Sequence, residues 1–245
     1  MYPRIQRKYA KFISFSGIDG AGKSTQINNL RAHLEDLGLS VCVFQFWDDV
    51  ATLTRLRESG AHALFKGDSG VGSPSAPINR RDKNVQSWPM SCVRLCIYLA
   101  DSVSTTIFVK RALRSRVDVI IFDRYIFDEL ANLNLQNPVM RVFARLITAL
   151  VPMPDVACIL DADPAAARAR KPEYPLDFLT TSRQSYLSLS NLIGGMTVVS
   201  PMSKQEIESE ILRLATMALP LGADPLKTSG IVPPIRPSDV DPIAL

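Results

Sequence analysis

The stretch that decides the fold of this chain is residues 12–44, which read FISFSGIDGAGKSTQINNLRAHLEDLGLSVCVF. A short β-rich run at 12–15 is followed by a glycine-rich turn and then by leucines at helical spacing. Gly38 stands where the C-cap of that helix belongs. The apolar run at 41–44 is typical of a strand buried on both faces. Strand, helix and strand in this order predict parallel strands joined by a right-handed crossover.

The same alternation continues along the rest of the sequence. Three further apolar runs, at 117–122, 156–160 and 196–199, are strand candidates. Helical patterns are expected at 88–113, 126–135, 139–150, 164–170, 178–189 and 204–219. Five strands alternating with helices predict an α/β three-layer sandwich around a five-stranded parallel sheet.

Two segments and a short arm fall outside this pattern. Residues 67–77 contain eight Gly, Ser or Pro residues out of eleven, which predicts a flexible surface loop. Residues 220–245 contain six prolines and show no periodicity, so we expect a disordered tail. Residues 1–10 form a basic arm. The expected folded domain is therefore 11–219.

Composition narrows the class of protein. The chain has 245 residues, 47% of them hydrophobic and 21% charged, with a mean hydropathy of +0.08. These values exclude collagen-like, acidic disordered and small disulfide-rich proteins. The net charge of +4 is compatible with an anionic ligand but low for a protein that binds nucleic-acid polymers. No apolar run approaches 18 residues, so we expect no membrane span and a cytoplasmic location.

The four cysteines lack the paired CxxC spacing of a zinc site. They are Cys42, Cys92, Cys96 and Cys158, and each lies in an apolar stretch. We expect buried free thiols in a reducing compartment.

The turn after the first strand carries the motif GxxxxGK[ST], directly before a helix. Glycines let the backbone wrap a phosphate chain with its N–H groups, and the start of the helix adds its positive dipole end. Lys23 would neutralise phosphate charge, and the Ser24 hydroxyl would ligate Mg²⁺. The residues expected to bind the nucleotide are Gly17, Ile18, Asp19, Gly20, Ala21, Gly22, Lys23, Ser24 and Thr25.

The third strand candidate ends in Asp123, Arg124 and Tyr125. In open α/β sheets, ligands bind at the carboxyl ends of the strands. Asp123 could hold a Mg²⁺-bound water, and Arg124 could contact a phosphate with two parallel hydrogen bonds. A salt bridge that caps the next helix is the alternative interpretation.

These residues resemble the thymidylate kinase family of P-loop nucleoside monophosphate kinases. The resemblance covers roughly residues 10–217. It is carried by GIDGAGKSTQ, by Asp-Arg-Tyr at 123–125, by the strand that ends in Leu160 and Asp161, and by the later segment with Tyr174, Phe178, Arg183 and Tyr186. It implies a P-loop kinase fold, phosphoryl transfer from ATP to dTMP with Mg²⁺, and a homodimer formed through long helices.

The resemblance also implies roles for single residues. Asp19 would recognise the 3′-hydroxyl of the acceptor sugar, Arg124 would contact the acceptor phosphate, and Tyr98 would stack on the base. Some family members place a catalytic arginine at the position of Gly20. Here the resemblance points instead to a lid at about 164–183, with Arg168 or Arg170 as the catalytic arginine.

The sequence departs from the family at the acceptor site. Asp49 stands in place of the expected phosphate-binding arginine, unless Arg55 or Arg57 reaches in from further along the chain. Ser102 stands in place of the base-reading arginine. An alternative polar pocket could form on one helix face that carries Arg94, Tyr98, Asp101 and Ser102.

Three functions therefore stay open on the sequence alone. The first is ATP-dependent phosphorylation of dTMP. The second is the same chemistry on another nucleoside, nucleotide or hydroxylated metabolite. The third is nucleotide binding without acceptor activity.

Overall fold

The computed structural model describes residues 10–50 and 88–219, with side chains from residue 95 onward in the second segment. Its centre is one parallel sheet in the order β2-β3-β1-β4-β5. The strands are β1 (Lys11–Ser16), β2 (Val41–Gln45), β3 (Val119–Asp123), β4 (Val156–Leu160) and β5 (Met196–Val199). The five-stranded parallel sheet is as predicted.

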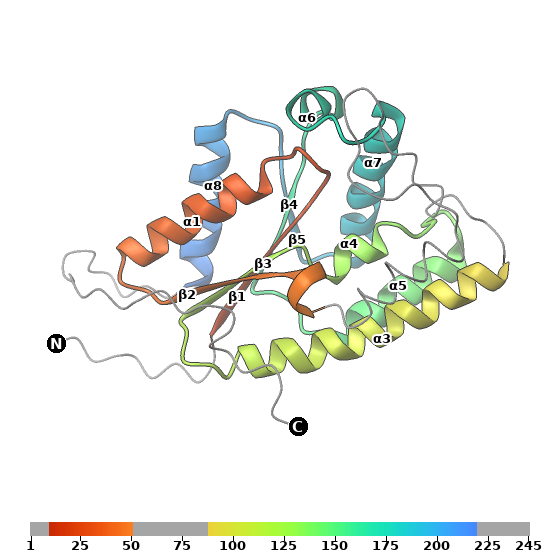
Figure 1. Ribbon diagram of the computed structural model, residues 1–245, viewed down its shortest axis with the longest axis horizontal. Coiled ribbons are helices and arrows are strands. Elements are labelled where there is room, and N and C mark those ends of the chain that lie inside the picture. The colour runs from red at the N-terminus through yellow and green to blue at the C-terminus, as the bar shows by residue number, and fades with distance from the viewer. Residues whose placement is uncertain (1–9, 51–87, 220–245) are drawn as a thin grey trace.

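Helices cover both faces of this sheet (Figure 1). Helices α1 (Lys23–Asp36) and α8 (Lys204–Ala218) pack together on one face. The other face carries α3 (Trp88–Ala112), α4 (Ile126–Leu130), α5 (Pro138–Leu150) and α7 (Leu176–Ile193). Two short elements complete the fold, the single turn η1 (Phe46–Val50) and α6 (Pro164–Arg170). The three-layer α/β architecture is confirmed.

Strand β1 is buried along almost its whole length because strands flank it on both sides. Its residue Phe15 pairs in register with Asp123 of β3 and with Cys158 of β4. The carboxyl ends of β1, β3 and β4 therefore lie together at one edge of the sheet. The loops that follow these three strands meet there and build the site.

Gly38 ends α1 by the expected mechanism. Its φ of 78° is in the left-handed region, its N–H donates to the Glu35 carbonyl at 2.8 Å, and the Leu39 N–H donates to the Leu34 carbonyl at 3.0 Å. This pair of bonds is a Schellman motif, which satisfies carbonyls that the end of the helix leaves unpaired.

Three local expectations differ from the structure. The helix expected at 126–135 stops at Leu130, and turns follow in which the Asn132 side chain donates to the Asp128 carbonyl at 2.9 Å. Side-chain amides that bond the main chain compete with helix continuation in this way. Helix α7 begins two residues earlier than expected, after Pro175, and η1 was not anticipated.

The core is aromatic around Tyr125, which is fully buried. Its ring makes edge contacts with Phe12, Phe122 and Phe127 at centroid distances of 5.2–5.7 Å, and its hydroxyl donates to the Pro152 carbonyl at 2.7 Å. Burial raises the pKa of this phenol. Tyr125 is thus anchored in the core, and this anchor fixes the position of the adjacent Arg124 backbone.

The cysteine expectation needs one correction. Cys42 and Cys158 are buried free thiols, and burial raises the pKa of Cys158 to about 12. Cys96, in contrast, is exposed because it lies on an outer face of α3. Cys92 lies outside the residues whose side chains are described.

Some expectations fall on parts of the chain that the structure does not describe. They are the basic arm up to residue 9, the loop at 67–77, Arg55 and Arg57, and the tail at 220–245. Among the described helices, none has the length and apolar character needed to cross a membrane.

Candidate functional site

The glycine-rich loop joins the carboxyl end of β1 to the start of α1. The helix after β1 lies on one face of the sheet, whereas the helices after β3 and β4 lie on the other (Figure 1). The loop therefore sits where connections leave neighbouring strands in opposite directions. This is the crevice in which open α/β sheets bind their ligands.

Two glycines of the loop fit where other residues would not. Gly17 has φ 139°, and a Cβ there would lie 2.5 Å from the Leu160 carbonyl oxygen. Gly20 has φ 82°, and its Cβ would lie 2.3 Å from the carbonyl oxygen of Ala167 in α6. The loop thus packs closely against the end of β4 and against α6.

The loop leaves main-chain donors unused. The Ala21 N–H donates to the Ile18 carbonyl at 3.2 Å, and the Gln26 N–H donates to the Gly22 carbonyl at 3.1 Å. Within the described segments, the N–H groups of Gly22, Lys23 and Ser24 have no acceptor. Unpaired N–H groups at the start of a fourteen-residue helix form an anion-binding site.

Lys23 points back into the loop. Its Nζ donates to the carbonyls of Gly17 and Ile18 at 2.9 and 3.0 Å, and only 6% of the residue is exposed. Burial, followed by the nearby Arg124, lowers the pKa of Lys23 to about 8, although neighbouring carboxylates partly oppose this shift. A buried cation whose neighbouring carboxylates do not fully offset its burial favours an anionic ligand.

The expected magnesium ligands have suitable chemistry. The exposed Ser24 hydroxyl follows Lys23, and Asp123 ends the neighbouring strand β3. Burial raises the pKa of the Asp123 carboxyl, while Lys23 and Arg124 oppose the shift. Mg²⁺ is commonly held by one or two protein oxygens together with substrate phosphates and water, and this donor pair fits that pattern. The described residues hold no cluster of three or more His, Cys, Asp or Glu suited to a metal.

Arg124 has an unusual backbone and two acidic partners. Its φ is 70°, and among the described residues it is the one non-glycine residue with positive φ. The guanidinium forms ion pairs with Asp19 and, at 2.8 Å, with Asp128. Burial opposes the charged form, but Asp128 and its neighbours outweigh burial and raise the pKa of Arg124. Strained backbone of this kind is concentrated at functional sites.

Asp128 is a site residue that the sequence analysis missed. It lies on α4, four residues after Arg124, and is 3% exposed. Besides Arg124, its carboxylate accepts hydrogen bonds from Ser16, Tyr125 and Tyr186. The i, i+4 spacing between Arg124 and Asp128 is enough to predict their ion pair. The contact with Tyr186 had no local signal.

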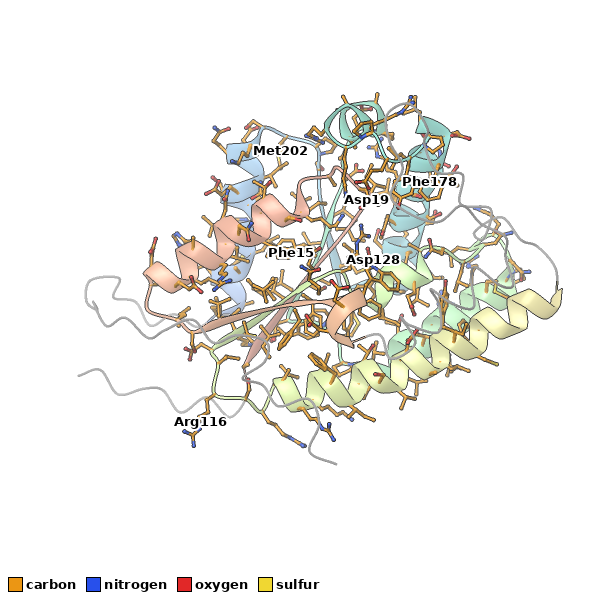
Figure 2. All side chains as sticks on the ribbon, in the orientation of Figure 1. Phe15, Asp19, Arg116, Asp128, Phe178 and Met202 are labelled. Atoms are coloured by element: carbon orange, nitrogen blue, oxygen red, sulfur yellow. The ribbon has the colours of Figure 1, made fainter. Side chains whose placement is uncertain are left out.

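A small opening lies beside Asp19 and Arg124. Its lining includes Asn132, Phe178 and Ser182, and Figure 2 shows Asp19 and Phe178 at the same end of the molecule. The Phe178 ring stacks on Tyr174 at a centroid distance of 5.0 Å. The opening combines a carboxylate, a guanidinium and an aromatic ring, as an acceptor nucleotide would require.

The predicted polar face of α3 lies elsewhere. Tyr98 is 7% exposed and Asp101 is fully buried, and neither belongs to the described lining of this opening. The Ser102 hydroxyl donates to the Leu99 carbonyl of its own helix at 2.7 Å. Arg94 lies where side chains are not described. Base stacking by Tyr98 and acceptor binding by Arg94 and Asp101 stay predictions.

The candidate lid is α6 and the start of α7. Asp163 caps α6 by accepting the Ala166 N–H at 2.8 Å. Arg168 is half-buried and Arg170 exposed, and neither forms an ion pair with any described residue. Their charges are available to a ligand on the α6 side of the loop.

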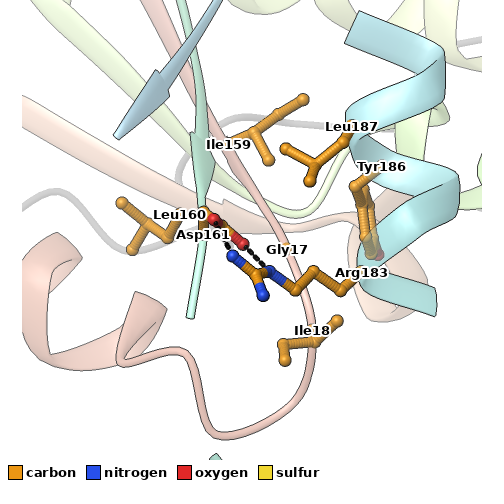
Figure 3. Close-up of a pocket in the computed structure, with 8 residues that line it drawn as sticks. All are labelled: Gly17, Ile18, Ile159, Leu160, Asp161, Arg183, Tyr186 and Leu187. Atoms are coloured by element: carbon orange, nitrogen blue, oxygen red, sulfur yellow. Dashed lines mark hydrogen bonds and ion pairs between the residues drawn. The ribbon is translucent and has the colours of Figure 1, made fainter. Parts of the chain in front are cut away.

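A second ion pair fixes the base of this lid. Asp161 directly follows β4, and both of its oxygens accept hydrogen bonds from Arg183 of α7 at 2.6 and 2.7 Å (Figure 3). Gly17, Ile18 and Tyr186 lie in the same small pocket. The two ends of the lid segment are thereby held beside the glycine-rich loop.

Asp49 does not point a free carboxylate at the site. It accepts the Gln45 N–H at 2.7 Å and so caps the end of β2.

Known proteins with similar sequences share one description. The chain is 29% identical over 195 residues to the thymidylate kinase of Bifidobacterium longum (strain DJO10A). The matched region covers 73% of this chain and 83% of that protein. It is 28% identical over 220 residues to the probable thymidylate kinase of Pyrobaculum aerophilum, covering 83% and 95%. The chain is similar to thymidylate kinases. No protein-family model matches it.

A solved structure supports the fold. The crystal structure of thymidylate kinase from Ehrlichia chaffeensis is 20% identical and superposes with a TM-score of 0.50, over 84% of this chain and 98% of that one. The resemblance to the thymidylate kinase family and the expected nucleotide-kinase fold are confirmed.

Proposed function

We propose that this protein transfers the γ-phosphoryl group of ATP to dTMP. The observation that carries the proposal is the phosphate-binding loop with unpaired N–H groups, whose buried Lys23 lies close to the Arg124–Asp19 ion pair. One edge of the sheet thus offers a cradle for a donor phosphate beside a cation and a carboxylate for an acceptor. Phosphoryl transfer depends on this kind of positioning and charge stabilisation.

The donor side uses the residues around the start of α1. Residues 17–25 would wrap the β- and γ-phosphates, and Lys23 would neutralise their charge. Ser24 and Asp123 would hold Mg²⁺, which shields the phosphate oxygens from the attacking oxygen when bound. Without a ligand, Lys23 donates to two loop carbonyls. When ATP binds, these hydrogen bonds would be exchanged for bonds to phosphate oxygens.

The acceptor side uses the opening beside Asp19. Arg124 would contact the acceptor phosphate and Asp19 the sugar hydroxyl, so their ion pair must open as the acceptor enters. Arg168 or Arg170 would close over the transferring group and exclude water. Their lack of ion pairs within the described segments supports this assignment.

A direct assay tests this function. Purified protein with ATP, Mg²⁺ and dTMP is expected to form ADP and dTDP in equal amounts, measured by ion-exchange chromatography. An absence of dTDP at millimolar dTMP would overturn the proposal.

Lys23→Ala should lower kcat by about 100-fold or more. The change removes the charge that stabilises the transferring phosphate, and a loss of this size equals about 2.7 kcal/mol of barrier. The matched control is Lys204→Ala, which removes an exposed lysine at the start of α8 and should leave kcat unchanged. If Lys23→Ala kept full activity, this loop would not be the catalytic donor site.

A second acceptor is favoured by one observation. Ser102 stands where the resemblance expects a base-reading arginine, and it is bonded to its own helix. Loss of a hydrogen bond from a protein side chain to the base strongly reduces discrimination among bases. A screen of nucleosides, nucleotides and small hydroxylated metabolites, followed by ADP release, separates this alternative from dTMP. If ATP binds but no acceptor increases turnover, the protein is a nucleotide-binding protein without acceptor activity.

We also propose that two copies of the chain form a homodimer through α3 and α5. These helices are joined by the Thr106 hydroxyl, which donates to the Leu150 carbonyl at 3.0 Å. Their outer faces expose a run of apolar side chains, namely Leu99, Val103 and Ile107 on α3 and Val139, Val142, Leu146 and Leu150 on α5. Contiguous exposed apolar surface of this kind marks an interface.

A further inference from the structure

The buried carboxylate of Asp128 has all of its hydrogen-bonding positions filled. Its Oδ1 accepts from Arg124 at 2.8 Å and from the Tyr186 hydroxyl at 2.7 Å. Its Oδ2 accepts from the Ser16 hydroxyl at 2.7 Å and from the Tyr125 N–H at 3.1 Å. A carboxylate has about four acceptor sites, so Asp128 has none left for a substrate or a metal.

The four donors come from three parts of the fold. Ser16 ends β1 just before the phosphate-binding loop, and Tyr186 lies on α7 beyond the lid. Arg124 and Tyr125 belong to the turn after β3. Asp128 therefore connects the elements on either side of the candidate site through a single buried group.

The same carboxylate supports the strained backbone of Arg124. The Arg124 N–H donates to the Phe15 carbonyl at 2.9 Å, and the next N–H, of Tyr125, donates to Asp128. The left-handed conformation at Arg124 is thus held on both sides. The guanidinium, bonded to Asp128 through Nη1, is left with Nη2 directed at Asp19.

We propose that Asp128 is the positioning residue for Arg124, and that with Tyr186 it fixes the arginine at the acceptor side of the site. The kinetic consequence of this inference rests on the proposed function, whereas the positioning of Arg124 by Asp128 does not. Asp128 touches no reacting group and acts through Arg124.

The first test is a crystal structure of the Asp128→Asn variant without ligands. An amide offers one acceptor oxygen and one donor nitrogen in place of two acceptors. The Ser16 and Tyr186 hydroxyls can turn and accept from that nitrogen, but either the Arg124 guanidinium or the Tyr125 N–H loses its acceptor. We expect the Arg124 guanidinium to leave its position beside Asp19. An Arg124 in an unchanged position would overturn the proposal, whether or not the protein phosphorylates dTMP.

The second test is kinetic and uses the full-length protein. Asp128→Asn should raise KM for dTMP about tenfold or more, equal to about 1.4 kcal/mol, while KM for ATP changes less than twofold. Tyr186→Phe keeps the ring and removes one donor, so a smaller rise in the same constant is expected. The control Asp155→Asn removes a carboxylate that also pairs with a cation, Lys11, and with a main-chain N–H, but at the other end of β4. It should leave both constants unchanged.

A double-mutant cycle separates positioning from general stability. In an Arg124→Ala background, Asp128→Asn should cost little further dTMP affinity, because its effect passes through the arginine. Equal losses in both backgrounds, or equal rises in KM for ATP and dTMP, would overturn the proposal. If Asp128→Asn does not fold, the same cycle with Tyr186→Phe decides. If the wild-type enzyme makes no dTDP, the proposed function fails and the crystal structure still tests the role of Asp128.

Discussion

At the scale of single residues, Lys23 shows how a binding site is built at a cost to stability. Its ammonium is buried against two carbonyls, with Arg124 as a nearby like charge. Burial and this like charge both disfavour protonation, so the folded protein binds the lysine proton less tightly than the unfolded chain does. A bound polyphosphate would supply the missing negative charge.

This shift predicts a pH dependence of stability. Burial lowers the pKa of Lys23 to about 8 in the folded protein, from 10.5 for an ordinary lysine. Below pH 8, Lys23 is protonated in both the folded and the unfolded state, and the folded protein carries the full cost of burying the charge. As pH rises from 8 towards 10.5, the folded state loses its proton first and the penalty disappears, so the wild type should gain up to about 3 kcal/mol relative to Lys23→Met.

Urea unfolding of both proteins at pH 7.5, 9 and 10 measures this difference. The comparison with Lys23→Met cancels the titration of other groups. Parallel stability curves for the two proteins would show that the lysine is not desolvated as described.

At the scale of elements, the close approach of the phosphate-binding loop to α6 explains why this chain has glycine at position 20. A Cβ there would lie 2.3 Å from the Ala167 carbonyl oxygen, on backbone at φ 82°. An arginine at this position, as in some members of the family it resembles, would displace α6. The catalytic role of a lid arginine stays a prediction.

Gly20→Ala should therefore destabilise the protein more than Gly22→Ala does. Both positions have positive φ, which costs an alanine about 1–2 kcal/mol, but a Cβ on Gly22 would meet no atom within 4 Å. We expect a loss above about 2 kcal/mol for Gly20→Ala, measured by urea unfolding without ligand. Equal losses for the two variants would mean that α6 does not rest on Gly20 in solution.

At the scale of the whole molecule, the two faces of the sheet are covered differently. On α5, Val142 is 65% exposed, and on α3, Val103 is 57% exposed. A helix pair that leaves such side chains in water gains stability when a second copy covers them. The arrangement of α3 beside α5 thus bears on the proposed assembly.

Val142→Glu should convert the proposed dimer into a monomer. The charge would be buried without a partner at the interface, so the mass by light scattering is expected to fall from about twice 27.0 kDa to 27.0 kDa. Met217→Glu on α8 is the control, because this apolar residue is also exposed, at 74%, and lies across the sheet. A wild type that is already monomeric at micromolar concentration would contradict the dimer.

Local sequence patterns predict those parts of this protein that form within a few residues of one another. Hydrophobic periodicity and turn chemistry act over a few residues. They therefore predict the order of strands and helices, the glycine-rich loop with Lys23 and the Asp-Arg-Tyr turn. The Gly38 helix end belongs to this group, since a Schellman motif spans only six residues.

Only the tertiary structure decided which distant side chains meet. Ser16 and Tyr186 are 112 and 58 residues away from Asp128, yet both donate to its carboxylate. The burial of Tyr98 and the ion pair of Arg124 with Asp19, 105 residues apart, likewise depend on how the layers pack. Local propensity carries no information about such contacts, because they are fixed by the crossover connections that bring strand ends to one edge of the sheet.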